Sequence, residues 1–331
     1  MRTLALIINN PFNFISHPKL FMSSVNSILN LDQFEKQSVI AKGELFEVYK
    51  VEERKTNLPF AAKTFTNEIT LSPKHTIDGL SEKTASLSQL KHAAVAEFVG
   101  LSPSNFESEA KPTIIEEFLS NGSLDKVIEF GKKSIPIPGW DETKKLIILY
   151  GVASAMSFLH SHNIIHGHLT ASNVLLNEYL CPKVSDSFLL TLYHYLLDND
   201  SEVPFNVKDY SAYLAPEVLE NEEYSKAGDV YAFATIVYEL LTNQIPYEGL
   251  KFGQIFKKVM NGERPELKDE IPQSFRDLIN KCWSPNPNER PTFEQIVSDL
   301  ENNHEFRNGV NHEDFNDYVR YVKDASHLKI N

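Results

Sequence analysis

The sequence predicts an α+β fold with two lobes, in which a β-rich N-terminal lobe with one helix precedes a mainly α-helical C-terminal lobe. Two observations favour this class. Before about residue 118, short apolar runs alternate with polar residues and are bounded by turn residues, which is typical of strands. Beyond about residue 140, apolar residues recur at three- and four-residue steps, which is typical of helices. Strands grouped ahead of helices indicate an α+β arrangement.

The N-terminal lobe opens with strands. From Phe34 the chain reads FEKQSVIAKGELFEVYKVEERKTNLPFAAKTF, with two apolar runs joined near Gly43 and a third after the turn-like pair Thr56-Asn57. Residues 77–91 carry apolar side chains at helical spacing and predict an amphipathic helix. The stretch IIEEFLSNGSL then indicates a strand that runs into a turn at Asn121-Gly122.

The C-terminal lobe begins with a long helix. We expect this helix to open at Asp141, whose side chain suits an N-cap. Helical patterns continue in GDVYAFATIVYELLTN, IPQSFRDLINKCW and TFEQIVSDLEN, separated by Pro and Gly. Near the C-terminus, Phe315, Tyr318, Val319 and Val322 have helical spacing and predict a short helix docked on the body.

Composition narrows the classes of partner and compartment. The 331 residues include 32 Lys and Arg against 45 Asp and Glu, a net charge of −13, which disfavours nucleic acid and anionic membranes as partners. No apolar run reaches the roughly 18 residues of a membrane span, and the N-terminal apolar run is broken by Asn9, Asn10 and Pro11. Cys181 and Cys282 lack metal-type spacing, so we expect a reducing, cytoplasmic location.

Several motifs then occur in a fixed order, namely FAAKTF, LKHAAVAEFVG, IIEEFLSNGSL, IIHGHLTASNVLL, KVSDSFL, YLAPEVL, AGDVYAFATIVYELLTNQIPYEG and CWSPNPNERPTFEQI. Together they make residues 31–300 resemble a eukaryotic protein kinase of the tyrosine-kinase-like group. The resemblance implies an N-lobe of about 31–118 and a C-lobe of about 119–300, flanked by an extension (1–30) and a tail (301–331). It also implies that Asp229 braces the catalytic loop, and that Glu217 pairs with Arg290.

The resemblance implies a nucleotide site as well. Lys63 of FAAKTF matches the lysine that meets the nucleotide phosphates, and Asn173 and Asp186 match the two ligands of magnesium. The adenine pocket would be formed by apolar side chains from both lobes and by backbone groups of the hinge: Val48, Ala61, Leu175, Glu117 and Leu119. A plain core role for these apolar side chains is equally consistent with the sequence.

Two elements of the phosphate site depart from the kinase pattern. The glycine-rich loop reads AKGELFEV, so only Gly43 keeps a glycine position, and it fits either a phosphate cradle or a turn. The motif D-F-G reads Asp186-Ser187-Phe188, which places a hydroxyl where the apolar peg belongs and a ring where the glycine belongs. Asp186 is therefore either a metal ligand or a capping carboxylate.

The usual glutamate partner of the strand lysine is also missing. Its position holds Lys83, and Glu82 is one residue away, which is about 100° around a helix. The resemblance places Glu116 at the back of the adenine pocket, and we hypothesise that it pairs with Lys63 instead, and with Lys83 as a further candidate, because a buried carboxylate needs a cation. The alternative is a Glu116 turned toward solvent. If the pairing exists, Glu116→Gln should lower stability.

The catalytic loop lacks its aspartate. In IIHGHLTASNVLL, His168 stands at the catalytic position, and Thr170 and Tyr210 replace two further members of the set that contacts the transferred phosphate. His168 is either a base or a histidine held structurally in the loop. Gly167 replaces the arginine that receives an activation-segment phosphate.

These departures favour a pseudokinase that works as a scaffold or allosteric module, with signalling proteins as partners. Residual binding of ATP and magnesium is left open by the residues. The alternative is an atypical active Ser/Thr protein kinase that uses Lys63, Asn173 and Asp186 together with His168.

Overall fold

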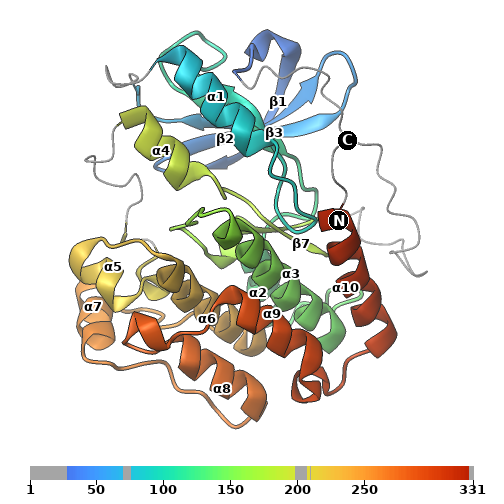
Figure 1. Ribbon diagram of the computed structural model, residues 1–331, viewed down its shortest axis with the longest axis vertical. Helices are drawn as coiled ribbons and strands as arrows, with labels where there is room; N and C mark the ends of the chain where they lie inside the picture. Colours follow the sequence, from blue (N-terminus) through green and yellow to red (C-terminus); the bar gives the residue numbers. More distant parts are fainter. Residues whose placement is uncertain (1–27, 70–75, 198–206, 209, 328–331) are drawn as a thin grey trace.

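The structure is a computed structural model that describes residues 28–69, 76–197, 207–208 and 210–327. It has the two-lobed α+β kinase fold expected from the sequence, with a sheet and one helix above a mainly helical lobe (Figure 1). Every helix in the described ranges is too short or too polar to span a bilayer.

The N-terminal lobe is built on an antiparallel sheet of five strands in the order β1-β2-β3-β5-β4. The strands are β1 (Phe34–Lys42), β2 (Phe46–Glu53), β3 (Pro59–Phe65), β4 (Phe98–Ser102) and β5 (Thr113–Glu117). Strand β3 lies at the centre and is buried from Phe60 to Phe65. Between β2 and β3, Asn57 takes the left-handed conformation (φ 58°) that a tight turn requires.

Helix α1 (Ile77–Ser88) is the helix expected at residues 77–91. Thr76 caps it by accepting a hydrogen bond from the Gly79 N–H, and Leu80, Thr84 and Leu87 are buried. Ile77 is 51% exposed, so the first apolar position of the pattern faces solvent rather than the sheet.

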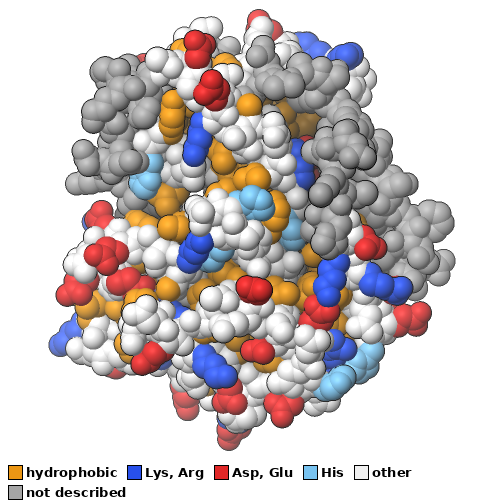
Figure 2. All heavy atoms as spheres, in the orientation of Figure 1, with side chains coloured by type: hydrophobic (Ala, Val, Ile, Leu, Met, Phe, Trp, Pro, Cys, Tyr) orange, Lys and Arg blue, Asp and Glu red, His pale blue; other side chains and the backbone are white. Residues whose placement is uncertain are grey.

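The C-terminal lobe packs around two long helices, α3 (Glu142–Ser161) and α6 (Lys226–Thr242), which are buried over most of their surfaces. Asp141 caps α3 as predicted, because its side chain accepts a hydrogen bond from the Lys144 N–H. Around them lie α2 (Leu124–Lys132), α5 (Pro216–Asn221), α7 (Phe252–Met260), α8 (Gln273–Cys282) and α9 (Phe293–Asn302). Figure 2 shows acidic and basic side chains interspersed over one face of this lobe.

The tail forms helix α10 (His312–His327), which packs against α3. The rings of Tyr150 and Phe315 meet edge to face with centroids 5.6 Å apart. The helix expected from the tail pattern is present, and its apolar face is the one that docks.

A short hairpin places the functional loops between the lobes. Strands β6 (Val174–Leu176) and β7 (Pro182–Val184) pair antiparallel, and Val184 forms a bridge with Val95 of the N-terminal lobe. After β7 and the turn at Asp186 comes α4 (Leu189–Leu197), a helix that the sequence did not predict.

Candidate active site

Three largely buried charged side chains meet between the two lobes. Lys63 comes from β3, Glu116 from the end of β5, and Asp186 from the segment after β7. The Lys63 Nζ lies 2.8 Å from Glu116 Oε2 and 2.6 Å from Asp186 Oδ1, and the side chains are only 8%, 5% and 12% exposed. The hypothesised pairing of Glu116 with Lys63 is thus present, and the solvent-facing alternative is wrong. We call these three residues the lysine–carboxylate cluster.

The electrostatics of the cluster follow from burial and mutual attraction. Burial opposes the charge of Lys63, but Asp186 and Glu116 outweigh it and raise the lysine pKa. For Glu116 burial dominates and raises its pKa, whereas for Asp186 the attraction of Lys63 outweighs burial and lowers the pKa. Glu116 also accepts a hydrogen bond from the Asp186 backbone. The positive charge of Lys63 is therefore neutralised by the protein itself.

Helix α1 does not supply the partner of Lys63. Glu82 is exposed and Lys83 half-buried on that helix. In the described part of the chain, the ion pairs of Lys63 go to Glu116 and Asp186, and the suggested pairing of Lys83 with Glu116 is not seen. A carboxylate from the sheet therefore takes the role that the helix glutamate has in the kinase pattern.

The segment after β7 keeps an apolar anchor, shifted by one residue. Ser187 is buried and its hydroxyl donates to the Val184 carbonyl at 3.2 Å. Phe188 is 2% exposed, and its ring meets that of Phe98 on β4 edge to face at 5.6 Å. Asp186 itself takes a positive φ of 59°. The ring that follows Ser187 thus fills the N-terminal lobe core, and the turn presents the Asp186 carboxylate to Lys63.

The catalytic loop is held from below by Asp229 of α6. Its two carboxylate oxygens accept hydrogen bonds from the backbone N–H groups of His166 and Gly167, each at 2.9 Å. Asp229 is 2% exposed, and the bracing role expected for it is confirmed.

The expected pair of Glu217 and Arg290 is also present. Two parallel hydrogen bonds of 2.6 and 2.9 Å join the guanidinium to the carboxylate. The scaffold of the helical lobe therefore follows the kinase pattern even where the reacting groups do not.

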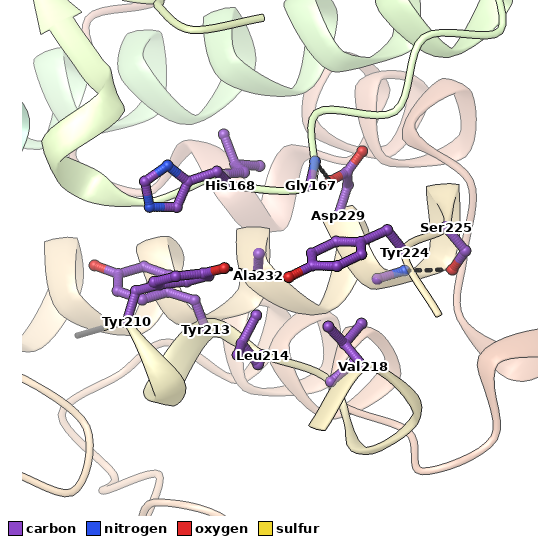
Figure 3. Close-up of a pocket in the computed structure, with 13 residues that line it drawn as sticks. Gly167, His168, Tyr210, Tyr213, Leu214, Val218, Tyr224, Ser225, Asp229 and Ala232 are labelled. Carbon is purple, nitrogen blue, oxygen red and sulfur yellow. Dashed lines mark hydrogen bonds between the residues drawn. The ribbon is translucent and has the colours of Figure 1, made fainter. Parts of the chain in front are cut away.

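His168 is enclosed by the loop and by the activation segment. The Asn173 amide donates to the His168 carbonyl at 2.8 Å, and its nitrogen lies 3.2 Å from the ring Nδ1. The ring of Tyr210 meets the imidazole edge to face at 4.4 Å, and the Tyr210 hydroxyl lies 3.3 Å from that of Tyr224 (Figure 3). Burial lowers the pKa of His168 to about 4, so the ring is uncharged and a weak base at neutral pH.

Of the two candidate magnesium ligands, Asp186 is bound to Lys63. Asn173 donates from its amide nitrogen to the His168 carbonyl, a contact that fixes the side chain without using the amide oxygen that a metal ion would need. Among the described residues, no group of three or more His, Cys, Asp or Glu side chains could hold a metal ion. Magnesium would have to take the Asp186 carboxylate from Lys63, so this arrangement does not fit a preformed metal site.

Two of the residues expected to form an adenine pocket lie beside the lysine–carboxylate cluster in the sheet. Across the sheet, Val48 pairs with Lys63 and Ala61 pairs with Glu116. Leu175 is half-buried on β6, and Leu119 is buried just beyond β5. The Glu117 N–H donates to the Glu97 carbonyl at 2.9 Å, so this hinge donor is already used within the protein.

Gly43 lies in the turn between β1 and β2. Its N–H donates to the Phe46 carbonyl at 2.8 Å, and a Cβ placed on it would meet only that oxygen, at an ordinary 3.6 Å. The turn therefore does not require a glycine. The ring of Phe46 packs against Phe65 of β3 with centroids 4.5 Å apart.

A buried carboxylate below the loop was not predicted. Glu239 of α6 is 4% exposed and accepts a hydrogen bond of 2.5 Å from the Tyr213 hydroxyl. That hydroxyl also accepts from the Ala171 N–H at 3.3 Å, so it joins α6 to the catalytic loop. Burial raises the pKa of Glu239 to about 8. A lone glutamate inside the apolar run AFATIVYELL was the available signal.

Fold and site define a protein of the kinase class, and comparison with known proteins agrees. Residues 34–300 match the family described as "Protein tyrosine and serine/threonine kinase", so the chain belongs to the protein kinase family. It is 27% identical over 277 residues to "Probable serine/threonine-protein kinase drkC" of Dictyostelium discoideum, covering 82% of this chain and 35% of that protein. It is 32% identical over 192 residues to "Dual specificity protein kinase pyk3" of the same organism, covering 57% of this chain and 14% of that protein. The chain thus spans a minor part of these relatives' length.

Proposed function

We propose that this chain is a pseudokinase, a protein-kinase domain that binds signalling proteins as a scaffold or allosteric module and transfers phosphate poorly or not at all. The observation that carries the proposal is the lysine–carboxylate cluster. Phosphoryl transfer needs a free cation and metal ions at the phosphates. Here the ammonium of Lys63 is already paired with Glu116 and Asp186. Asp186, the expected metal ligand, is therefore held by the lysine.

The catalytic loop supports the proposal independently. A kinase needs a base beside the substrate hydroxyl. The residue in that position, His168, has a pKa lowered to about 4 by burial and is covered by the Tyr210 ring. Binding of ATP with magnesium is proposed to be residual at most, and to require rearrangement of the cluster.

The second candidate is an atypical active Ser/Thr kinase. It is favoured by the presence of Lys63 and Asp186 in contact within the cleft and by the kinase names of the relatives. In such a kinase, nucleotide binding would break the contact between Lys63 and Asp186, and Asp186 would then bind a metal ion.

Transfer of labelled γ-phosphate to a generic protein substrate separates the two. The variant to compare is Asp186→Asn, because the amide can still accept a hydrogen bond from Lys63 while it is a poor ligand for magnesium. We expect no transfer by the wild-type chain. Transfer that is abolished in Asp186→Asn, with circular dichroism showing that the variant is folded, would overturn the pseudokinase proposal.

A further inference from the structure

A cavity of the helical lobe lies apart from the lysine–carboxylate cluster. Its volume is about 760 Å³, and its walls come mainly from α3, α9, the first turn of α6 and the later part of α10. Figure 1 shows α3 and α9 side by side, with α10 packed along α3. This volume is within the range of roughly 300–1,000 Å³ that is typical of sites for small molecules. We call it the α3–α9 cavity.

The α3–α9 cavity has aromatic walls. The Phe158 ring of α3 stacks with the imidazole of His92, with centroids 5.1 Å apart. Phe293, the first residue of α9, meets the His160 ring edge to face, also at 5.1 Å. Val297 adds aliphatic surface. Because burial of apolar surface contributes much of the affinity in such a site, these walls favour a ligand with a flat apolar body.

Two helix N-termini also line the cavity. Helix α6 begins at Lys226 and α9 at Phe293, and the second residues of these helices, Ala227 and Glu294, line the cavity as well. The first N–H groups of a helix have no acceptor within the helix, and they form the positive end of its dipole. These helix ends therefore favour an anionic group on the ligand.

Lys226 adds a full positive charge. Its Nζ donates to the Asn163 side chain at 3.0 Å, and it makes no ion pair within the described part of the chain. The carboxylate at the rim, Glu294, is exposed on the first turn of α9. The other basic side chains around the cavity have a partner or no charge: Arg290 (with Glu217), Lys323 (with Glu301), His160 (with Asp229), and His92, whose pKa burial lowers to about 4. Lys226 is thus the cation that a ligand can use.

We propose that the α3–α9 cavity binds a small organic acid with an aromatic body. The rings of the ligand would lie against Phe158 and Phe293, and its acidic group would meet Lys226 and the two helix ends. His160 connects this site to the catalytic loop, because its Nε2 lies 2.8 Å from the Asp229 carboxylate that holds the loop. This inference goes beyond the proposed function and does not depend on whether phosphate is transferred.

Two fluorescent probes with the same rings test the proposal on the full chain. Anilinonaphthalene sulfonate carries an acidic group, and phenylnaphthylamine has the same rings without it. By fluorescence titration at neutral pH, we expect the wild-type chain to bind both probes in a saturable way, and the sulfonate more tightly because it can also reach Lys226.

The first variant fills the cavity. Ser157 is half-buried on α3 and lines the cavity, so the ring added in Ser157→Phe would occupy the space of the ligand. We expect both probes to bind at least about tenfold more weakly. The matched control is Ser298→Phe, at an exposed position of α9 that does not line the cavity, and it should bind both probes with wild-type affinity.

The second variant removes the charge. Lys226→Gln should weaken binding of the sulfonate at least about fivefold and leave binding of phenylnaphthylamine unchanged. Lys126→Gln on α2 is its control and should not affect either probe. Since Lys226 is exposed, this comparison decides the matter even if circular dichroism shows that Ser157→Phe does not fold.

The site is overturned if the wild-type chain shows no saturable binding of the sulfonate, or if a folded Ser157→Phe binds it as the wild type does. The anion preference is overturned if Lys226→Gln binds the sulfonate with wild-type affinity, or if it weakens both probes alike.

Discussion

The ammonium of Lys63 lies 2.8 Å from the carboxylate of Glu116, which is on strand β5 rather than on helix α1. Since Asp186 binds the same ammonium at 2.6 Å, one cation serves two buried carboxylates. Removing one partner from such a site strands charge, and the size of the loss depends on which partner is removed. In this cluster Lys63 and Asp186, which an active kinase uses to bind nucleotide and metal, instead stabilise the fold.

Replacing the cation should cost far more stability than replacing one carboxylate. Lys63→Met leaves two carboxylates buried without a cation, and we expect a loss of about 3–5 kcal/mol in the free energy of unfolding. Glu116→Gln should cost only about 1 kcal/mol, because Asp186 still neutralises Lys63 and the amide oxygen can still accept hydrogen bonds. Urea unfolding measures both values.

The matched control for this comparison is Lys126→Met, whose ammonium is 3.9 Å from Asp125 and whose side chain is 62% exposed. It should change stability by less than about 0.5 kcal/mol. Equal losses for Lys63→Met and Glu116→Gln would show that the cluster is not organised around the lysine.

Restoring the catalytic aspartate should not restore catalysis. In His168→Asp the new carboxylate would be buried beside the Tyr210 ring with Asp186 nearby, so we expect a loss of about 2 kcal/mol and no phosphate transfer. The exposed His312 at the start of α10 provides the control, because His312→Asp should leave stability near the wild-type value. Transfer gained by His168→Asp alone would mean that the rest of the site is already competent.

Glu239 should make stability fall as pH rises. Its folded pKa of about 8 lies above the ordinary glutamate value of 4.5, so its contribution is complete below about pH 4.5 and is lost as pH rises through 8. Glu239→Gln keeps an acceptor for the Tyr213 hydroxyl and cannot ionise. Relative to wild type, we expect this variant to gain on the order of 4 kcal/mol between pH 5 and pH 8.5. The measurement is thermal unfolding of both proteins at the two pH values, and a constant difference between them would contradict the assignment.

Much of the fold could be predicted from local pattern. The apolar spacing of α1 and of the tail predicts helices with one face toward the core, and Asp141 predicts the start of a helix. The structure contains all three elements. The pairing of Glu116 with Lys63 was also predictable, because a carboxylate aligned to a buried position needs a cation.

Helix α4 could not be predicted in the same way. The run LLTLYHYLL is apolar on nearly every residue, so periodicity alone does not separate a helix from a buried strand. The fit of Leu190 against Gly167 depends on residues 23 positions apart that the fold brings together. The shift of the apolar anchor to Phe188 likewise depends on the positive φ of Asp186, which the sequence does not reveal.

If the lysine–carboxylate cluster closes the phosphate site, thermal unfolding in the presence of nucleotide should show it. A ligand present at about 100 times its dissociation constant adds roughly 2.7 kcal/mol of apparent stability. With millimolar ATP, we predict that adding magnesium leaves the melting temperature of the wild-type chain unchanged, while an active kinase domain measured alongside is stabilised. A magnesium-dependent rise in the wild-type melting temperature would contradict the claim, because it would show that Asp186 leaves Lys63 to hold a metal–nucleotide complex.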